Sequence, residues 1–159
     1  CAEAAGTHVM ASSGSSMISQ KCFDRIEAAL NIKIDHRIIF KSVYIPIKQC
    51  YESRPFGSEL SGLVSGSNIR PDGYQLHNKT VWLFHGNRWH GYPPSHPKHN
   101  DSDDMGPYIN RYNKTMQQHQ QYLNAGYNVH YIWEHEFVEC QRYSCPKHVK
   151  HVIRRLTAT

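Results

Sequence analysis

Apolar and polar residues alternate along the chain with two periods, one typical of helices and one typical of strands. Helical spacing occurs in residues 17–31 and 108–125, and in each segment the apolar residues fall on one face. Runs rich in β-branched and aromatic residues predict strands at 32–40, 43–47, 60–64, 74–76, 81–84 and 127–133. A helix with one apolar face needs a surface to cover, and the strands offer a sheet. The pattern therefore predicts an α/β fold with a sheet flanked by helices.

Composition divides the 159 residues into three parts. Residues 1–14 are small, polar and aperiodic, so we interpret them as a disordered end or a cloning remnant. Residues 15–137 hold the predicted elements and suit one domain with a moderate core. Residues 138–159 form a basic extension that we expect to be helical towards its end.

Segment 70–93 predicts a β-hairpin followed by a polar loop. Two short apolar runs flank Asn78-Lys79, as in two strands joined by a tight turn. The loop contains His85 and His90, and Gly86 between them would let the chain fold back on itself.

In that conformation His90 would reach the strand end at which Asp72 lies. A carboxylate, a carbonyl at a strand end and an imidazole suit a Mg²⁺ and general-base site for phosphodiester hydrolysis. The alternatives are a turn role for Asp72, since Pro-Asp-Gly is a common turn, and a hydrogen-bonded loop position for each histidine.

The same stretch resembles the very-short-patch repair endonuclease branch of the PD-(D/E)XK nuclease superfamily. In that branch an Asp is followed, twelve residues later, by the residue that precedes His-Gly-x-x-Trp-His. Asp72 and Phe84 keep that spacing, and HGNRWH runs from His85 to His90. The branch closes on a Gly-aromatic pair, an apolar strand and Trp-Glu, which Gly126-Tyr127 and Trp133-Glu134 match here.

The resemblance covers roughly residues 17–137. It implies a restriction endonuclease-like αβββαβ core, in which helices flank a mixed central sheet. Residues 17–31 resemble the opening helix of similar nuclease domains in mobile elements and large DNA viruses. The implied activity is an endonuclease that nicks or cuts DNA with Mg²⁺ or Mn²⁺.

Roles for individual residues also follow from the resemblance. Asp72 and the main-chain carbonyl of Phe84 would hold the metal ion, and His90 would be the general base that activates water. His85 would contact the scissile phosphate or orient the water. Glu59 would complete the metal shell, unless it is a solvated loop residue. Residues expected to contact DNA are Arg88, Trp89, Arg70 and Lys114. Trp89 would stack on a base or pack beneath the loop, and Thr115 lies where the family often has Asp or Thr.

Three departures from the family pattern limit what is implied. Leu83-Phe84-His85 stands in place of the Glu-x-Lys of most superfamily members, although the repair branch also uses histidine there. Arg88 replaces an aromatic residue that wedges into mismatched DNA, so we expect no mismatch specificity. The positions of the family's structural zinc are occupied by Asn87, Tyr92, Pro94 and His135, which do not preserve that site.

Two hypotheses stay open. The intact Asp72, His85 and His90 favour an active endonuclease, whereas the missing Glu at Leu83 favours a catalytically inactive nucleic-acid-binding module with the same fold. A histidine-ligated ββα nuclease is disfavoured, because the Pro-rich segment 93–107 leaves no helix directly after the loop.

Charge and cysteine usage add three expectations. Lys and Arg outnumber Asp and Glu by 18 to 13, which fits DNA as a partner. No run is apolar enough for a membrane helix, and five scattered cysteines without a visible signal peptide favour an intracellular protein. The residue types of a C-x4-C-x2-H-x2-H pattern suit a structural Zn²⁺, the alternative being a basic tail with two free thiols; its members are Cys140, Cys145, His148 and His151.

Overall fold

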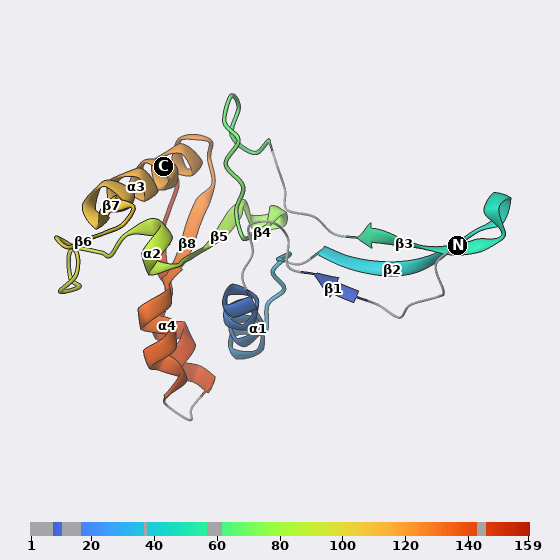
Figure 1. The fold of residues 1–159 in the computed structure, drawn as a ribbon, viewed down its shortest axis with the longest axis horizontal. Coiled ribbons are helices and arrows are strands. Elements are labelled where there is room, and N and C mark those ends of the chain that lie inside the picture. The colour runs from blue at the N-terminus through green and yellow to red at the C-terminus, as the bar shows by residue number, and fades with distance from the viewer. Residues whose placement is uncertain (1–7, 11–16, 37, 57–61, 143–145) are drawn as a thin grey trace.

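The computed structural model describes residues 8–10, 17–36, 38–56, 62–142 and 146–159 (Figure 1). Glu59 and Cys145 therefore lie outside the described residues. Within the segment expected to be disordered, His8–Met10 form strand β1, so that prediction does not hold for these three residues. The remainder of residues 1–14 lies outside the described part of the chain.

A four-stranded sheet of mixed orientation forms the centre of the molecule. Its order is β4-β5-β8-β9, with bounds Gly73–Gln75, Thr80–His85, Asn128–Trp133 and Arg154–Leu156. β5 runs parallel to β8, while β4 and β9 pair antiparallel at the two edges. The predicted mixed α/β class is confirmed, whereas the restriction endonuclease-like arrangement stays a prediction.

Strands β2 and β3 form a second sheet with β1 and extend away from the central sheet as a long hairpin (Figure 1). β2 spans Ile38–Ile45 and β3 spans Cys50–Phe56, joined by the 3-10 turn η1 at Pro46–Lys48. The two strands predicted at 32–40 and 43–47 are thus largely one strand. Residues 32–36 instead lie along β4, where Asp35 and Tyr74 exchange two backbone hydrogen bonds of 3.0 Å.

Among the described residues, two long helices cover the central sheet. α1 spans Met17–Leu30 and α3 spans Tyr108–Asn124, close to the predicted bounds. The shorter helices are α2 at Asn87–His90 and α4 at Glu134–Gln141, with 3-10 turns η2 at Leu76–Asn78 and η3 at Pro146–Val152. A small ribbon of β6, Ser102–Asp103, and β7, Gly106–Pro107, precedes α3. None of the helices described here combines the length and apolarity needed to cross a bilayer.

Strand β5 is buried on both faces, which explains why its sequence is a continuous apolar run. Trp82 and Phe84 point to the core that α1, α4 and η3 share, and Val81 and Leu83 point to the core under α3. Alternation then places His85 on the α3 side of the sheet.

The C-terminal extension differs from its prediction. Helical structure ends at Val152, and Arg154–Leu156 form β9 at the sheet edge, with Leu156 opposite Val129. Leu156 is partly buried and packs on the α3-side core. Cys22 and Cys140 are buried and free, whereas Cys50 is disulfide-bonded.

Candidate functional site

The end of β5 leads directly into the short helix α2, which turns the chain back over α3. The amide nitrogens of Trp89 and His90 donate to the carbonyl oxygen of Gly86. The expectation that Gly86 itself enables the fold-back is not met, because its φ of −63° is open to any residue. Gly91 has that role: its φ is +74°, and a Cβ there would lie 2.7 Å from the Tyr112 nitrogen.

Three histidines from three elements gather beneath this turn. The His85 ring centroid lies 4.6 Å from that of His90 and 4.9 Å from that of His119 of α3. His85 and His119 are each 2% exposed, and their Nε2 atoms are 2.7 Å apart, so one ring donates its proton to the other. Tyr131 and Trp133 of β8 complete the aromatic wall around His85.

His119 is a residue of the candidate site that the sequence did not predict. It lies on the apolar face of the predicted helix 108–125 and is not among the predicted site residues. A histidine in such a stripe, facing a strand that ends in another histidine, is a signal that could have identified the pair once the helix was placed against that strand.

Thr115 fixes the proton position on His90. The Thr115 hydroxyl lies 3.0 Å from the Arg111 carbonyl oxygen and 3.2 Å from that of His90, both of which can only accept. The hydroxyl therefore accepts from His90 Nδ1, 3.1 Å away, so that Nδ1 carries the proton and Nε2 keeps its lone pair.

Burial keeps this imidazole cluster neutral. It lowers the pKa of His90 to about 4, and burial together with the charge of His90 lowers the pKa of His119 to about 4. Burial, followed by the charges of His90 and His119, holds the pKa of His85 well below its ordinary value. All three rings are uncharged at neutral pH, each with one N–H.

Asp72, which directly precedes β4, contacts the same end of β5. Its Oδ2 accepts the Phe84 N–H at 2.8 Å, as a further residue of β4 would. The N–H and C=O of one strand residue face the same neighbour, so the Phe84 carbonyl faces the Asp72 side as well. Burial and then the Asp72 charge raise the pKa of Tyr122 of α3.

The ligand atoms at the end of β5 are of the chemical type that Mg²⁺ prefers. Mg²⁺ prefers oxygen and keeps several waters, so one carboxylate and one backbone carbonyl form a small but suitable set. Among the described histidines, cysteines, aspartates and glutamates, however, no three at this strand end have ligand atoms within 4.8 Å of one another. Whether Glu59 adds a ligand lies outside the described residues.

The residues expected to contact DNA are on the surface. Trp89 is 68% exposed, which excludes the alternative that it packs beneath the loop, and the Arg88 guanidinium lies 5.6 Å from its ring. Arg88 also pairs with Asp104 at 3.3 Å. Arg70 and Lys114 are exposed.

The loop after α2 is held by aromatic and hydrogen-bonding contacts. Asn87 and His135, at two positions of the resembled family's zinc site, are joined by a hydrogen bond of 2.8 Å between Oδ1 and Nδ1. Tyr92 stacks on His96 at 4.3 Å, and His96 packs against His135 at 4.6 Å. These contacts connect the loop to the start of α4 without a metal ligand set.

The predicted C-terminal zinc residues line one cavity. Cys140, His148 and His151 contribute to a space of about 620 Å³. The three do not form a group whose ligand atoms all lie within 4.8 Å of one another, and the His148 and His151 ring centroids are 6.1 Å apart. With Cys145 outside the described residues, zinc binding by this set stays a prediction.

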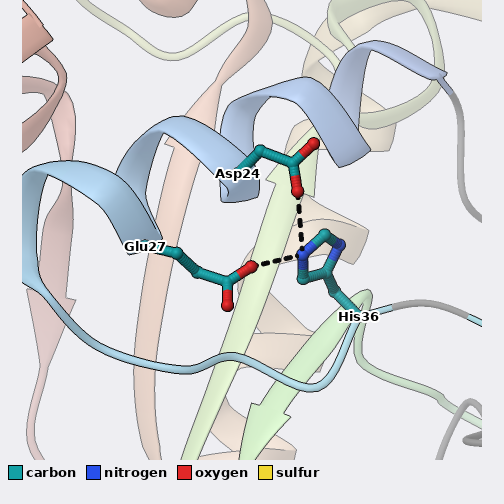
Figure 2. Close-up of side chains that lie close together, drawn as sticks. All are labelled: Asp24, Glu27 and His36. Atoms are coloured by element: carbon teal, nitrogen blue, oxygen red, sulfur yellow. Dashed lines mark hydrogen bonds and ion pairs between the residues drawn. The ribbon is translucent and has the colours of Figure 1, made fainter.

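A different group in the described residues could hold a metal ion. Asp24 and Glu27 of α1 and His36, which follows the helix, have ligand atoms that all lie within 4.8 Å of one another (Figure 2). Burial raises the Glu27 pKa, but hydrogen bonds from His36, Lys33 and the Ile34 amide outweigh it and lower the pKa overall. The sequence prediction missed this group, because His36 is in a segment read as a strand.

Comparison with known proteins adds no identification: no family model matches the chain, and no curated protein or solved structure is significantly similar to it.

Proposed function

We propose that the chain is a metal-dependent endonuclease that hydrolyses phosphodiester bonds of DNA at the end of β5. One observation carries the proposal: Asp72 and His90 both contact the last two residues of this strand. Asp72 binds the Phe84 amide, and the His90 ring packs on His85. A carboxylate and a neutral imidazole thus each contact the end of the same strand, which supports the site that the resemblance implies.

Asp72 and the Phe84 carbonyl are the groups that would hold the Mg²⁺ ion. When bound, the ion would neutralise the phosphate charge and lower the pKa of water. The Asp72 carboxylate keeps one oxygen on the Phe84 amide, which fixes its orientation relative to the strand.

His90 supplies the general base. Its Nε2 takes a proton from the attacking water as the new oxygen–phosphorus bond forms and the bond to the leaving oxygen breaks. Thr115 holds the tautomer that leaves this lone pair available. His85 is buried and bound to His119, so it supports the His90 ring instead of contacting the phosphate.

The exposed Trp89 and Arg88 give α2 a surface suited to nucleic acid. An exposed tryptophan can stack on a base, and a guanidinium can contact phosphate or a base edge. Lys114 and Arg70 add positive charge that favours a polyanion.

A catalytically inactive nucleic-acid-binding module is the second candidate. The observation that favours it is that, within the described residues, three metal-ligating side chains do not converge at the end of β5. Such a module would use the same α2 surface and bind DNA without cutting it.

Cleavage of supercoiled plasmid DNA in Mg²⁺ or Mn²⁺ tests the proposal. We expect wild-type cleavage and a loss of about a hundredfold or more in Asp72→Asn and His90→Gln. The exposed His77 of η2 offers a matched control, since His77→Gln should cut at the wild-type rate. Equal rates in all four proteins would refute the site, and DNA binding without cleavage in either ion would support the inactive module.

A further inference from the structure

We propose that Asp24, Glu27 and His36 form a binding site for one transition-metal dication, with Zn²⁺ as the ion that suits them best. Imidazole nitrogen and carboxylate oxygen are both ordinary zinc ligands, whereas Mg²⁺ prefers an all-oxygen shell. The site is independent of the proposed nuclease chemistry.

One donor separation equals that around a single ion, and the other is a hydrogen bond that would have to lengthen by a few tenths of an ångström. His36 Nε2 lies 2.7 Å from Glu27 Oε1 and 3.5 Å from Asp24 Oδ1, and Figure 2 shows both carboxylates directed at this one nitrogen. Ligands about 2.0–2.2 Å from a tetrahedral or octahedral ion are about 3.0–3.5 Å apart. A metal replacing the Nε2 proton would therefore need only small side-chain shifts.

The surrounding structure holds all three groups in place. Asp24 and Glu27 are one helical turn apart on α1, so they project to the same side. The His36 side chain is 2% exposed and packs edge-on against Phe23 at 5.4 Å. A Cβ at Gly73 would lie 2.7 Å from Ile34 Cγ2 and 3.2 Å from the His36 Cβ, so the glycine lets residues 34–36 pack closely against β4.

Lys33 does not compete for the coordinating atoms. Its ammonium lies 3.1 Å from Glu27 Oε2, while Oε1 faces His36. The Ile34 amide also donates to Oε2 at 3.3 Å, so one oxygen orients the carboxylate and the other remains for the ion. Asp24 is 45% exposed, which gives an ion a route from solvent.

The site lies on the opposite face of the sheet from the β5 cluster. His36 packs against Phe23 in the α1-side core, and a Cβ at Gly73 would meet Ile34, His36 and Trp82, whereas His85 is paired with His119 of α3. Loss of this site therefore leaves the Asp72 and His90 groups unchanged, and the two proposals can fail separately.

Titration calorimetry of the full chain with Zn²⁺ tests the inference, with thermal unfolding as a second readout. The background protein carries His148→Gln and His151→Gln, so that the C-terminal histidines do not contribute to the measured number of bound Zn²⁺ ions. We expect one bound equivalent, a higher Tm with Zn²⁺ than with Mg²⁺, and an affinity at least about tenfold weaker in Asp24→Asn and His36→Gln.

Two substitutions of exposed residues provide matched controls. Asp35→Asn and His77→Gln change the same residue types outside the group and should bind Zn²⁺ as the background protein does. Asp24→Asn keeps the side-chain shape, so its unfolding curve without metal checks that the fold persists. Absence of the bound equivalent, or equal affinity in Asp24→Asn, His36→Gln and the controls, would overturn the proposal.

Discussion

At the scale of single residues, the candidate site depends on which atoms can only accept hydrogen bonds. Two backbone carbonyl oxygens accept the Thr115 hydroxyl proton, so the hydroxyl oxygen is left to accept a hydrogen bond from His90 Nδ1. In the His85–His119 pair one Nε2 donates and the other accepts. A network of this kind sets the tautomer of a base without any charge in contact with it.

Thr115→Val should therefore slow DNA cleavage with little loss of folding, because the methyl group fills the space of the hydroxyl but cannot hold the His90 tautomer. We expect a fall of up to about a hundredfold in the single-turnover rate, with DNA affinity unchanged. Thr115→Ser keeps the hydroxyl and should restore most of the rate. Equal rates for the Val variant and the wild type would remove Thr115 as a positioning residue.

The imidazole cluster also predicts how stability depends on pH. His90 and His119 have an ordinary pKa of 6.5 when unfolded and about 4 when folded. Between these values the unfolded chain holds protons that the folded chain lacks, so the free energy of unfolding decreases as pH falls from 6.5 to 4. We expect Tm to drop on the order of 5 °C or more over this window, and His119→Asn to reduce the drop. A Tm that does not change across the window would contradict the buried neutral cluster.

At the scale of elements, close contact between α2 and α3 places His90 over the cluster. Gly91 permits this contact, since a Cβ there would meet backbone atoms of Tyr108 and Tyr112 in addition to the strain of φ +74°. Sequence patterns predicted α1 and α3 well because their apolar residues recur at helical spacing, and β5 and β8 because each is a short run rich in β-branched and aromatic residues. They could not predict that Gly91, and not Gly86, is the tightly packed position.

Gly91→Ala should accordingly destabilise the fold by about 2–4 kcal/mol, since backbone strain and a steric clash add. Gly126→Ala is the matched control. Gly126 also has a positive φ, of +90°, but its Cβ would meet nothing within 4 Å, so strain alone should cost about 1–2 kcal/mol. Urea unfolding of both variants measures the difference, and equal losses would show that the α2–α3 contact adds no constraint.

At the scale of the whole molecule, the sheet separates two groups of potential ligands. The histidine cluster lies on the α3 side with Asp72 at the end of β5, and the Asp24 group lies on the α1 side. Spacing within one segment identified Asp72, His85 and His90 in the sequence. His119 and His36 come from other segments, and only the packing of α3 on β5 and of residues 32–36 along β4 brings them to their sites.

The charge of the whole chain predicts salt-sensitive DNA binding through the α2 surface. Arg88→Ala should weaken binding and reduce the slope of log K against log salt by about one. Asp104→Asn should tighten binding, because it releases Arg88 from its ion pair. Lys21→Ala on α1, an exposed cation on the other side of the sheet, is the control. Identical slopes for the wild type and Arg88→Ala would exclude Arg88 from the interface.

The central claim is that Asp72 and His90 belong to one catalytic site, and a double-mutant cycle on DNA cleavage tests it most directly. Single-turnover rates would be measured in Mg²⁺ for wild type, Asp72→Asn, His90→Gln and the double variant. Groups that act as a unit are not additive, so the double variant should be about as slow as the slower single variant. Two losses that multiply, or single variants that cut at the wild-type rate, would contradict the claim.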